Sequence, residues 1–218
     1  MPSLCKSSIK IALTPTPKEL RAMHMEEHTL SAMSDELKLR LGRFRHEQFV
    51  EKLGWRLPGH PHQAGCEWDQ YDTEHARYLL AFSEHRAIVG CARLIPTPFP
   101  NLLEGVFSHT CAGTPPKDPA IWEMTRFTTR EPQLAMPLFW RSLKTASLAG
   151  ADFIVGIVNS TMERYYKING VNYERLGPVT VHQDEKILAI KLSAHREHHR
   201  GVRPPSAFMP GALLKDTA

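Results

Sequence analysis

The sequence has no apolar run approaching the roughly 18 residues that a membrane-spanning helix needs. Its first residues, Met1–Lys6, also lack the apolar segment of a signal peptide. We therefore expect a cytoplasmic protein with no stable membrane association.

Cysteine and net charge are both low. The four cysteines, Cys5, Cys66, Cys91 and Cys111, form no Cys-x-x-Cys pair, so neither a zinc site nor a redox motif is predicted, and we expect no metal. Lys and Arg number 27 against 23 Asp and Glu, a net charge of +4. This mild, dispersed charge does not predict a nucleic-acid partner, although it permits an acidic protein partner.

What the chain does have is a composition typical of one globular domain. It is 218 residues long and 42% hydrophobic, enough for a substantial core. Prolines and the absence of any period predict that residues 1–20 are an extension. The domain is expected over residues 21–194, followed by a basic, proline-rich tail over residues 195–218. The histidines near residue 195 could bind a metal, but a solvated tail is the favoured interpretation.

Periodicity and turn residues predict alternating strands and helices, hence an α/β fold. A helix should begin at the N-cap Ser34 and end near Gly54. The other expected elements are a first strand at Ile9–Leu13 or Arg21–Glu26, a loop over Leu57–Cys66, a hairpin of Arg77–Phe82 with Ala87–Pro96, a short helix over Asn101–Phe107, a helix over Pro132–Gly150, a strand at Phe153–Val158, a helix over Thr161–Asn169 capped by Ser160 or Thr161, and strands at Val171–Leu176 and Ile187–Leu192.

The central strand is predicted at Ile121–Phe127, and it carries two opposite charges. Glu123 and Arg126 are three residues apart, so on a regular strand they face opposite sides of the sheet. They can share a face only if the strand bulges near Met124–Arg126. A surface strand with two solvated charges is the alternative. Arg93 lies in a second apolar strand and needs a carboxylate partner there.

Three further features suggest a ligand site. Arg45 and Phe49 are four residues apart on the first helix and share a face. Asp69 and Asp72 could hold an ammonium group, although spacing alone favours a solvated turn. Trp55 offers a face for a cation, although core packing is the commoner role for a single Trp.

Together these residues resemble a known family. Arg45-x-x-x-Phe49 with Trp55, Asp69-x-x-Asp72, Arg93, Phe107 and Glu123-x-x-Arg126-Phe127 are similar to the signature of LuxI-type acyl-homoserine-lactone synthases, over roughly residues 21–192. The loop before Asp69 is slightly longer than in that family. The resemblance implies a GNAT-like acyltransferase fold, with a mixed twisted sheet and helices packed on both faces.

The resemblance also implies an activity. Such enzymes join an acyl chain from acyl carrier protein to the amine of S-adenosyl-L-methionine, then close a lactone ring and release methylthioadenosine. The product is a quorum-sensing signal. S-Adenosylmethionine is a substrate here, and no cofactor is expected.

Site roles follow from the same resemblance. The implied catalytic residues are Glu123, as the base, with Arg126, Arg45 and Arg93. The implied S-adenosylmethionine site contains Arg45, Phe49, Trp55, Asp69, Asp72 and Arg126. The acyl pocket is expected to include Phe107, Met124, Phe127, Trp140, Leu143 and Gly156, for each of which ordinary core packing is the alternative. Arg164 and Lys167 are expected to dock the carrier protein, unless they only form a solvated helix face.

Gly156 also bears on the acyl chain. Relatives that make 3-oxo signals often carry a threonine at the matching position, and glycine offers no such hydroxyl. We therefore expect an unsubstituted chain of six to eight carbons.

Two other functions remain possible at this point. An acyltransferase of the same fold that uses acetyl-coenzyme A would want a glycine-rich loop after the central strand, but Thr128–Gln133 contains no glycine. A non-catalytic binding module would be expected to lose the charged residues, all of which are present.

Overall fold

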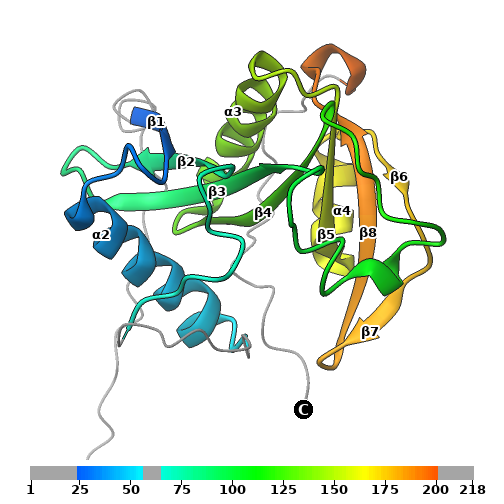
Figure 1. Cartoon of the computed structure of the whole chain (residues 1–218), viewed down its shortest axis with the longest axis horizontal. Coiled ribbons are helices and arrows are strands. Elements are labelled where there is room, and N and C mark those ends of the chain that lie inside the picture. Colours follow the sequence, from blue (N-terminus) through cyan, green and yellow to red (C-terminus); the bar gives the residue numbers. More distant parts are fainter. Residues whose placement is uncertain (1–23, 56–64, 201–218) are drawn as a thin grey trace, which may run out of the picture.

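The computed structural model describes residues 24–55 and 65–200 of the 218. One mixed sheet runs through the molecule in the strand order β1-β2-β3-β4-β5-β8-β6, with β7 also paired to β8 (Figure 1). The pairing of β4 with β5 is parallel and every other pairing is antiparallel. The strands are β1 His24–Thr29, β2 Arg77–Phe82, β3 Ile88–Pro96, β4 Ile121–Thr129, β5 Phe153–Asn159, β6 Glu174–Arg175, β7 Thr180–His182 and β8 Glu185–Ser193.

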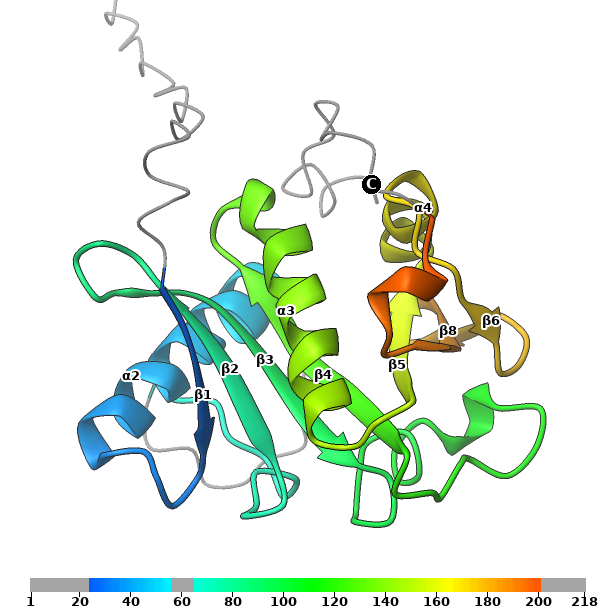
Figure 2. The same cartoon turned by 90° about the horizontal axis from the view of Figure 1, so that it is seen from above.

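Helices cover both faces of this sheet, as predicted. Helix α2, Asp35–Arg45, packs on one face, and α3, Ala135–Leu148, packs on the other (Figure 2). Helix α4, Ser160–Ile168, shares a buried cluster with α3 and therefore lies on the same face as α3. The core is thus divided by the sheet into an α2 side and an α3 side.

Local signals explain the limits of α2. The Ser34 side chain accepts a hydrogen bond from the Leu37 amide (3.2 Å), which satisfies a free donor of the first turn. The helix continues as a π-helical turn, η1 His46–Lys52, and ends at Gly54, whose φ of 66° favours glycine. The predicted cap and stop are both confirmed.

Several predicted elements need correction. The first strand is His24–Thr29, which only overlaps Arg21–Glu26; residues 9–13 and 57–64 lie outside the described residues. Helix α4 is capped by Asn159, which accepts from the Met162 amide at 2.8 Å, and not by Ser160 or Thr161. An unpredicted strand, β7, forms a hairpin with β8 because Gln183 and Asp184 adopt positive φ.

The helix expected over Asn101–Phe107 is absent; the segment is a series of turns followed by a 3-10 turn, η2 Ser108–Thr110. The amides of Leu102 and Leu103 bond to the distant Glu123 carboxylate instead of being left free at a helix start. A second short turn, η3 Pro132–Leu134, precedes α3, and Gly150 follows its end with a φ of 99°.

The solvated tail expected from residue 195 does not begin there. A 3-10 turn, η4 Arg196–His198, lies against α3, and His199 is buried with its ring bonded to Asn172 and Ser193. Residues 201–218 lie outside the described part of the chain. Over residues 24–55 and 65–200, no group of three or more His, Cys, Asp or Glu is placed to hold a metal ion.

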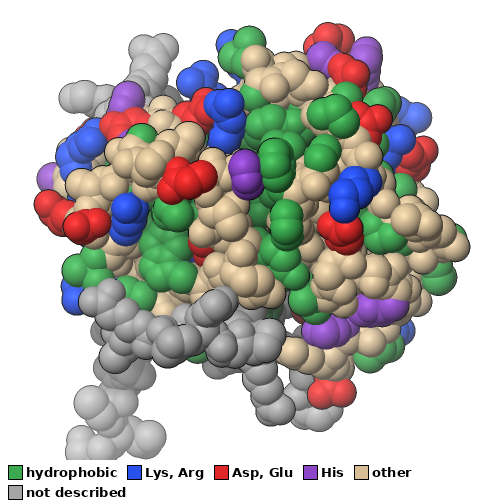
Figure 3. Space-filling model, in the orientation of Figure 1, with side chains coloured by type: hydrophobic (Ala, Val, Ile, Leu, Met, Phe, Trp, Pro, Cys, Tyr) green, Lys and Arg blue, Asp and Glu red, His purple; other side chains and the backbone are tan. Residues whose placement is uncertain are grey.

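Two further observations concern the length of the helices and the charge of the surface. No helix among the described residues is long and apolar enough to cross a membrane. On the face seen in Figure 3, basic and acidic side chains are interspersed and form no continuous basic area of the kind that binds nucleic-acid phosphates.

Two irregularities of β4 shape the centre of the molecule. Its ladder with β5 covers only Ile121–Glu123 opposite Phe153–Val155, so the two strands separate beyond that point. Its ladder with β3 carries an extra residue on β4, since Arg93 pairs with Thr125 while Cys91 pairs with Thr128. Arg126 lies in this bulge with a φ of 51°, a conformation that is uncommon for a residue with a side chain. The predicted bulge is confirmed.

Candidate active site

Three arginines and three carboxylates form one buried network on the α2 side of the sheet. Arg45 comes from the end of α2, Arg93 from β3 and Arg126 from the bulge of β4. Their partners, Glu67, Asp69 and Asp72, all come from the segment that leads to β2. Each of these six side chains is at most 10% exposed.

The network is interlocked because each arginine binds two carboxylates. Arg45 contacts Asp72 through two parallel bonds (2.8 and 3.0 Å) and also donates to Glu67. Arg93 binds Asp69 in the same two-bond manner (2.6 and 3.0 Å) and lies 2.9 Å from Asp72. Arg126 reaches Glu67 at 2.9 Å and Asp69 at 2.6 Å. Such paired, charge-assisted bonds fix the position of every group in the set.

The charges of the network compensate one another. Burial by itself raises the pKa of Glu67 and Asp72, but the neighbouring arginines outweigh it and hold both pKa values below their usual range. Burial likewise lowers the pKa of Arg45 and Arg93, and their carboxylate partners raise it above the ordinary value. Each of these four shifts favours the charged form of its group. By formal charge, the three arginines of the network balance its three carboxylates.

Glu123 stands apart from this balanced set. Its side chain is completely buried, and its two oxygens accept the amides of Leu102 (3.0 Å) and Leu103 (2.6 Å). The bulge of β4 would allow Glu123 and Arg126 to share a face, but no ion pair joins Glu123 to an arginine in the described structure. Burial raises the pKa of Glu123 to about 7, although the two amides and the charge of Arg93 lower it. A carboxylate with that pKa is suited to take up a proton near neutral pH.

Glu67 is the network residue that the sequence prediction missed. Its loop, Glu67-Trp68-Asp69-Gln70-Tyr71-Asp72, has the composition of a solvated turn, yet Glu67 is fully buried. The loop lies close against α2 because Gly42 has no side chain: a Cβ there would overlap the Trp68 indole. In the sequence, Arg45, Arg93 and Arg126 already had Asp69, Asp72 and Glu123 as candidate partners, so no signal there indicated a further acid.

The aromatic residues expected near the ligand do come together. Trp55 stacks on Phe49 with ring centroids 4.8 Å apart. The Arg126 guanidinium carbon lies 5.7 Å from the centroid of each ring. Phe49 and Trp55 therefore contact each other and lie beside the network at Arg126.

Asp69 and Asp72 were expected to offer their charge to an ammonium group, but both are already bound to arginines. Asp72 also accepts from Tyr78 and from the Asp69 amide, and its side chain is only 4% exposed. Asp69 is slightly more accessible, at 10%. The loop borders a cavity of about 540 Å³ lined by Leu30, Lys38, Trp68, Asp69, Gln70 and Asp72.

The expected acyl-pocket residues are divided between the two faces of the sheet. Trp140 and Leu143 belong to the buried cluster under α3, with Met124 and Phe127 packed against it. Phe107 lies in a different cluster, with Leu103 and Val155, on the side of Glu123. Gly156 faces the space between β4 and β5, where an added Cβ would meet only the Met124 carbonyl oxygen, at 3.1 Å.

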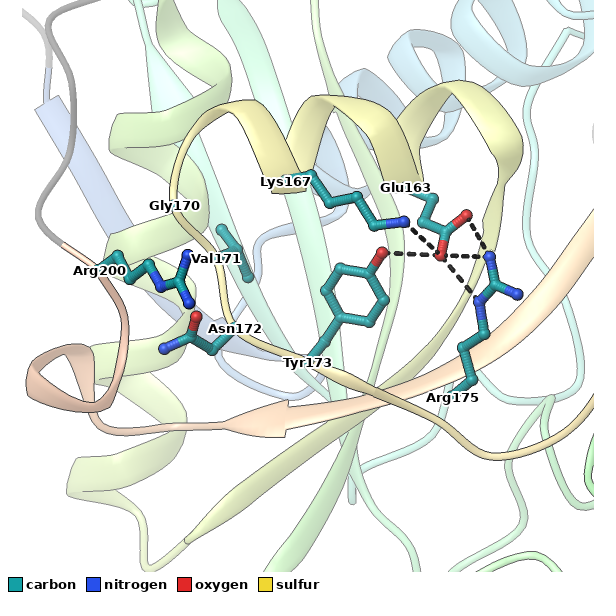
Figure 4. Close-up of a pocket in the computed structure, with 8 residues that line it drawn as sticks. All are labelled: Glu163, Lys167, Gly170, Val171, Asn172, Tyr173, Arg175 and Arg200. Atoms are coloured by element: carbon teal, nitrogen blue, oxygen red, sulfur yellow. Dashed lines mark hydrogen bonds and ion pairs between the residues drawn. The ribbon is translucent and has the colours of Figure 1, made fainter.

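The two basic residues expected to dock a partner are both exposed on α4, but they differ in surroundings. Lys167 borders a cavity of about 420 Å³ at the end of α4, together with Glu163, Gly170, Val171, Asn172, Tyr173, Arg175 and Arg200 (Figure 4). Glu163 is held there by Tyr173 (2.7 Å), Arg175 (2.9 Å) and Lys167 (3.5 Å). Arg164 is not among the residues that line this cavity.

Comparison with known proteins shows which family the chain resembles. The family model described as "Autoinducer synthase" matches residues 28–202. The acyl-homoserine-lactone synthase of Pseudomonas chlororaphis is 88% identical over 196 residues, which are 90% of this chain and 100% of that protein. The synthase of Pseudomonas aeruginosa is 41% identical over 172 residues, covering 78% of this chain and 85% of that one.

Solved structures give the same result. The crystal structure of TofI in a ternary complex with an inhibitor and MTA has a TM-score of 0.72 at 30% identity, covering 78% of this chain and 91% of that one. The CoA-dependent acyl-homoserine lactone synthase BjaI, solved with SAM and isopentyl-CoA, has a TM-score of 0.72 at 27% identity, covering 80% and 84%.

The mixed sheet, whose strands β4 and β5 separate beyond Glu123, is the GNAT-like acyltransferase fold that the chain shares with these solved synthases. Within that class, the chain belongs to the autoinducer synthase family. It is an acyl-homoserine-lactone synthase.

Proposed function

We propose that this synthase transfers a medium acyl chain from acyl carrier protein to S-adenosyl-L-methionine, with Glu123 as the base. The observation that carries the proposal is the position of Glu123. It is a buried carboxylate with a pKa of about 7, outside a charge-balanced network and next to the point where β4 and β5 separate.

The chemistry requires one proton to be removed before the acyl group moves. The ammonium of S-adenosylmethionine gives a proton to Glu123, directly or through one water, and the neutral nitrogen attacks the thioester carbonyl. The carbon–sulfur bond of the thioester breaks, and the leaving thiolate takes up the second proton, which the nitrogen releases as the amide forms. In the second step the carboxylate oxygen attacks the carbon next to the sulfonium, the lactone closes, and neutral methylthioadenosine departs. Both steps depend mainly on positioning.

The charge of the site supports a cationic substrate. The six-residue network sums to zero, so ionised Glu123 leaves one negative charge in excess, and a substrate ammonium would compensate it. We propose that Trp55 and Phe49 supply an apolar face for the substrate, with Arg126, Arg45 and Arg93 orienting its carboxylate through the network. Asp69 and Asp72 act by holding these arginines in place. TofI has been solved with MTA and BjaI with SAM.

The acyl chain is proposed to enter the space between β4 and β5. Gly156 leaves this space open from the β5 side. Met124, Phe127, Trp140 and Leu143 would receive the chain on the α3 side, while Phe107 lies on the Glu123 side, near the carbonyl.

The overall reaction is tested by supplying both kinds of acyl donor. The purified protein is incubated with S-adenosylmethionine and thioesters of four to twelve carbons, on acyl carrier protein or on coenzyme A, and the lactones are identified by mass spectrometry. We expect acyl-homoserine lactone and methylthioadenosine from the carrier-protein thioesters. Faster turnover with the coenzyme A thioesters would assign the donor class of BjaI, and no lactone from either donor would contradict the proposed reaction.

If the acidic carrier protein docks on α4, reversing a positive charge on that helix should weaken its binding. Arg164→Glu should raise the KM for acyl carrier protein while leaving kcat unchanged, because the residue is exposed on α4 and is not part of the Glu123 site. Arg43→Glu is the matched control: it makes the same change in net charge, at an exposed position on α2, on the opposite face of the sheet. Equal KM values for the two variants would discard α4 as the docking surface.

Acyl selectivity is predicted to depend on Gly156. Glycine provides no donor for a 3-oxo group, and a buried acceptor without a partner costs about 1–3 kcal/mol. We therefore expect hexanoyl or octanoyl products, and Gly156→Thr should increase the share of 3-oxo product by at least several fold in competition assays. A wild-type product dominated by 3-oxo lactones would contradict this. It would direct attention to the indole nitrogen of Trp140, which is buried with no hydrogen-bond partner in the described structure.

A further inference from the structure

The Glu123 carboxylate is held by a turn whose own shape depends on one buried side chain. Leu102 and Leu103 present consecutive amides to the two oxygens of Glu123. A turn is a weak element on its own, and nothing in the local sequence pattern requires this one. Two backbone bonds close the turn, from the Gly105 amide to the Asn101 carbonyl (3.1 Å) and from the Phe107 amide to the Leu102 carbonyl (3.0 Å). A side-chain contact is still needed to hold the closed turn against the strand that carries the carboxylate.

Asn101 provides that contact. Its side chain is only 2% exposed. Its amide nitrogen donates to the carbonyls of Thr97 (3.2 Å) and Phe99 (2.9 Å), and its amide oxygen accepts from the Glu104 amide (3.0 Å). One side chain thus ties the end of β3 to the turn on both sides of Leu102 and Leu103.

The segment to which Asn101 ties the turn is itself held to β4. Thr97 and Asp118 exchange two hydrogen bonds of 3.0 Å, and the Thr97 amide bonds to the carbonyl of Ile121, the first residue of β4. Gly105 lets the turn lie against the buried ring of Tyr71, because a Cβ there would overlap the phenol oxygen. The turn therefore has a fixed position relative to the strand that carries Glu123.

We infer that Asn101 is a positioning residue of the reaction, which fixes the turn whose amides orient and stabilise the ionised Glu123 carboxylate. The inference rests on the proposed role of Glu123 as the base. The side-chain bonds of Asn101 go to backbone groups of Thr97, Phe99 and Glu104, so Asn101 acts through the position of the turn.

The test is Asn101→Ala, with two readouts on the full chain. Loosening the turn removes amide hydrogen bonds to the charged form of Glu123, so its pKa should rise by about one unit. The charged or titratable groups that face Glu123, Arg93 on β3 with Asp69 and Tyr71 on the preceding loop, are unchanged by the substitution. The acidic limb of the pH profile of kcat/KM, which reports the free enzyme, should move upward by the same amount, giving a roughly tenfold loss near pH 6.5 that disappears above pH 9.

The pKa of Glu123 is also read directly, by carbon NMR of protein labelled at the Glu carboxyl carbons, with the resonance assigned by its loss in Glu123→Gln. This readout needs no turnover, so the inference can fail or hold independently of the base role.

Asn169→Ala is the control. Asn169 is also buried and bonds a backbone carbonyl, at the C-terminal end of α4 across the sheet. Asn101→Ser replaces Asn101→Ala if the latter does not fold. An unchanged Glu123 pKa, or a rate loss equal at every pH, would overturn the inference.

Discussion

Glu123→Gln is expected to lose amide formation by roughly 10²–10⁴-fold, the usual contribution of a general base. In the wild type, the rate should fall about tenfold per pH unit below pH 7, because only the ionised carboxylate accepts the substrate proton and its pKa is about 7. The residual rate of Glu123→Gln should not show this fall below pH 7. Single-turnover assays with preloaded acyl donor, from pH 5.5 to 8.5, measure both effects.

The fold of this variant must be checked, because glutamine places an NH₂ group against one of the two amides that bond Glu123. Leaving that amide unpaired costs about 1–3 kcal/mol. Near-UV circular dichroism and the unfolding midpoint show whether the protein remains native. A native variant with near-normal turnover would remove Glu123 from the role of base.

Glu67→Gln is expected to lower the free energy of unfolding by about 3–5 kcal/mol, the typical cost of breaking a buried ion pair on one side. Glu67 is fully buried and accepts bonds from both Arg45 and Arg126. The substitution leaves three guanidinium groups against two carboxylates in low dielectric. Arg126 would also lose a partner that fixes its side chain in the bulge of β4.

Urea unfolding measures this effect, with Glu104→Gln as the matched control. Glu104 forms a solvent-exposed pair with Lys117 at 3.0 Å, and exposed pairs contribute about 0–1 kcal/mol. A loss below 1 kcal/mol in Glu67→Gln would mean that the network is not a unit of stability. S-Adenosylmethionine binding should weaken in the same variant, because Arg45 and Arg126 are no longer held in one geometry.

Much of the fold could be predicted from local patterns. The hairpin of β2 and β3, the cap at Ser34, the stop at Gly54 and the apolar central strand each depend on residues close together in sequence. Even the bulge at Arg126 could be predicted, because two charges three residues apart on an apolar strand cannot both reach one polar region without it.

The secondary-structure predictions that were wrong share a different cause. Residues 101–107 have the apolar spacing of a short helix, but their amides bond a carboxylate twenty residues further along the chain. Asn159 replaced the neighbouring Ser160 as a cap, since Asn159 ends β5 with its side chain already next to the first turn of α4. In both places a partner fixed by tertiary structure outweighed a local preference.

The sequence by itself therefore determined the class of this protein, because its charged and aromatic residues form a spaced set that resembles one family. Only the tertiary structure decided which carboxylates join the arginine network and which one stays outside it. Glu67 became the third acid of the network when α2 and its Gly42 brought the loop against the arginines. Glu123 was left outside, bonded to neutral amides and to no arginine. Burial, which the two amides and the charge of Arg93 offset only in part, is the physical reason that its pKa lies near 7.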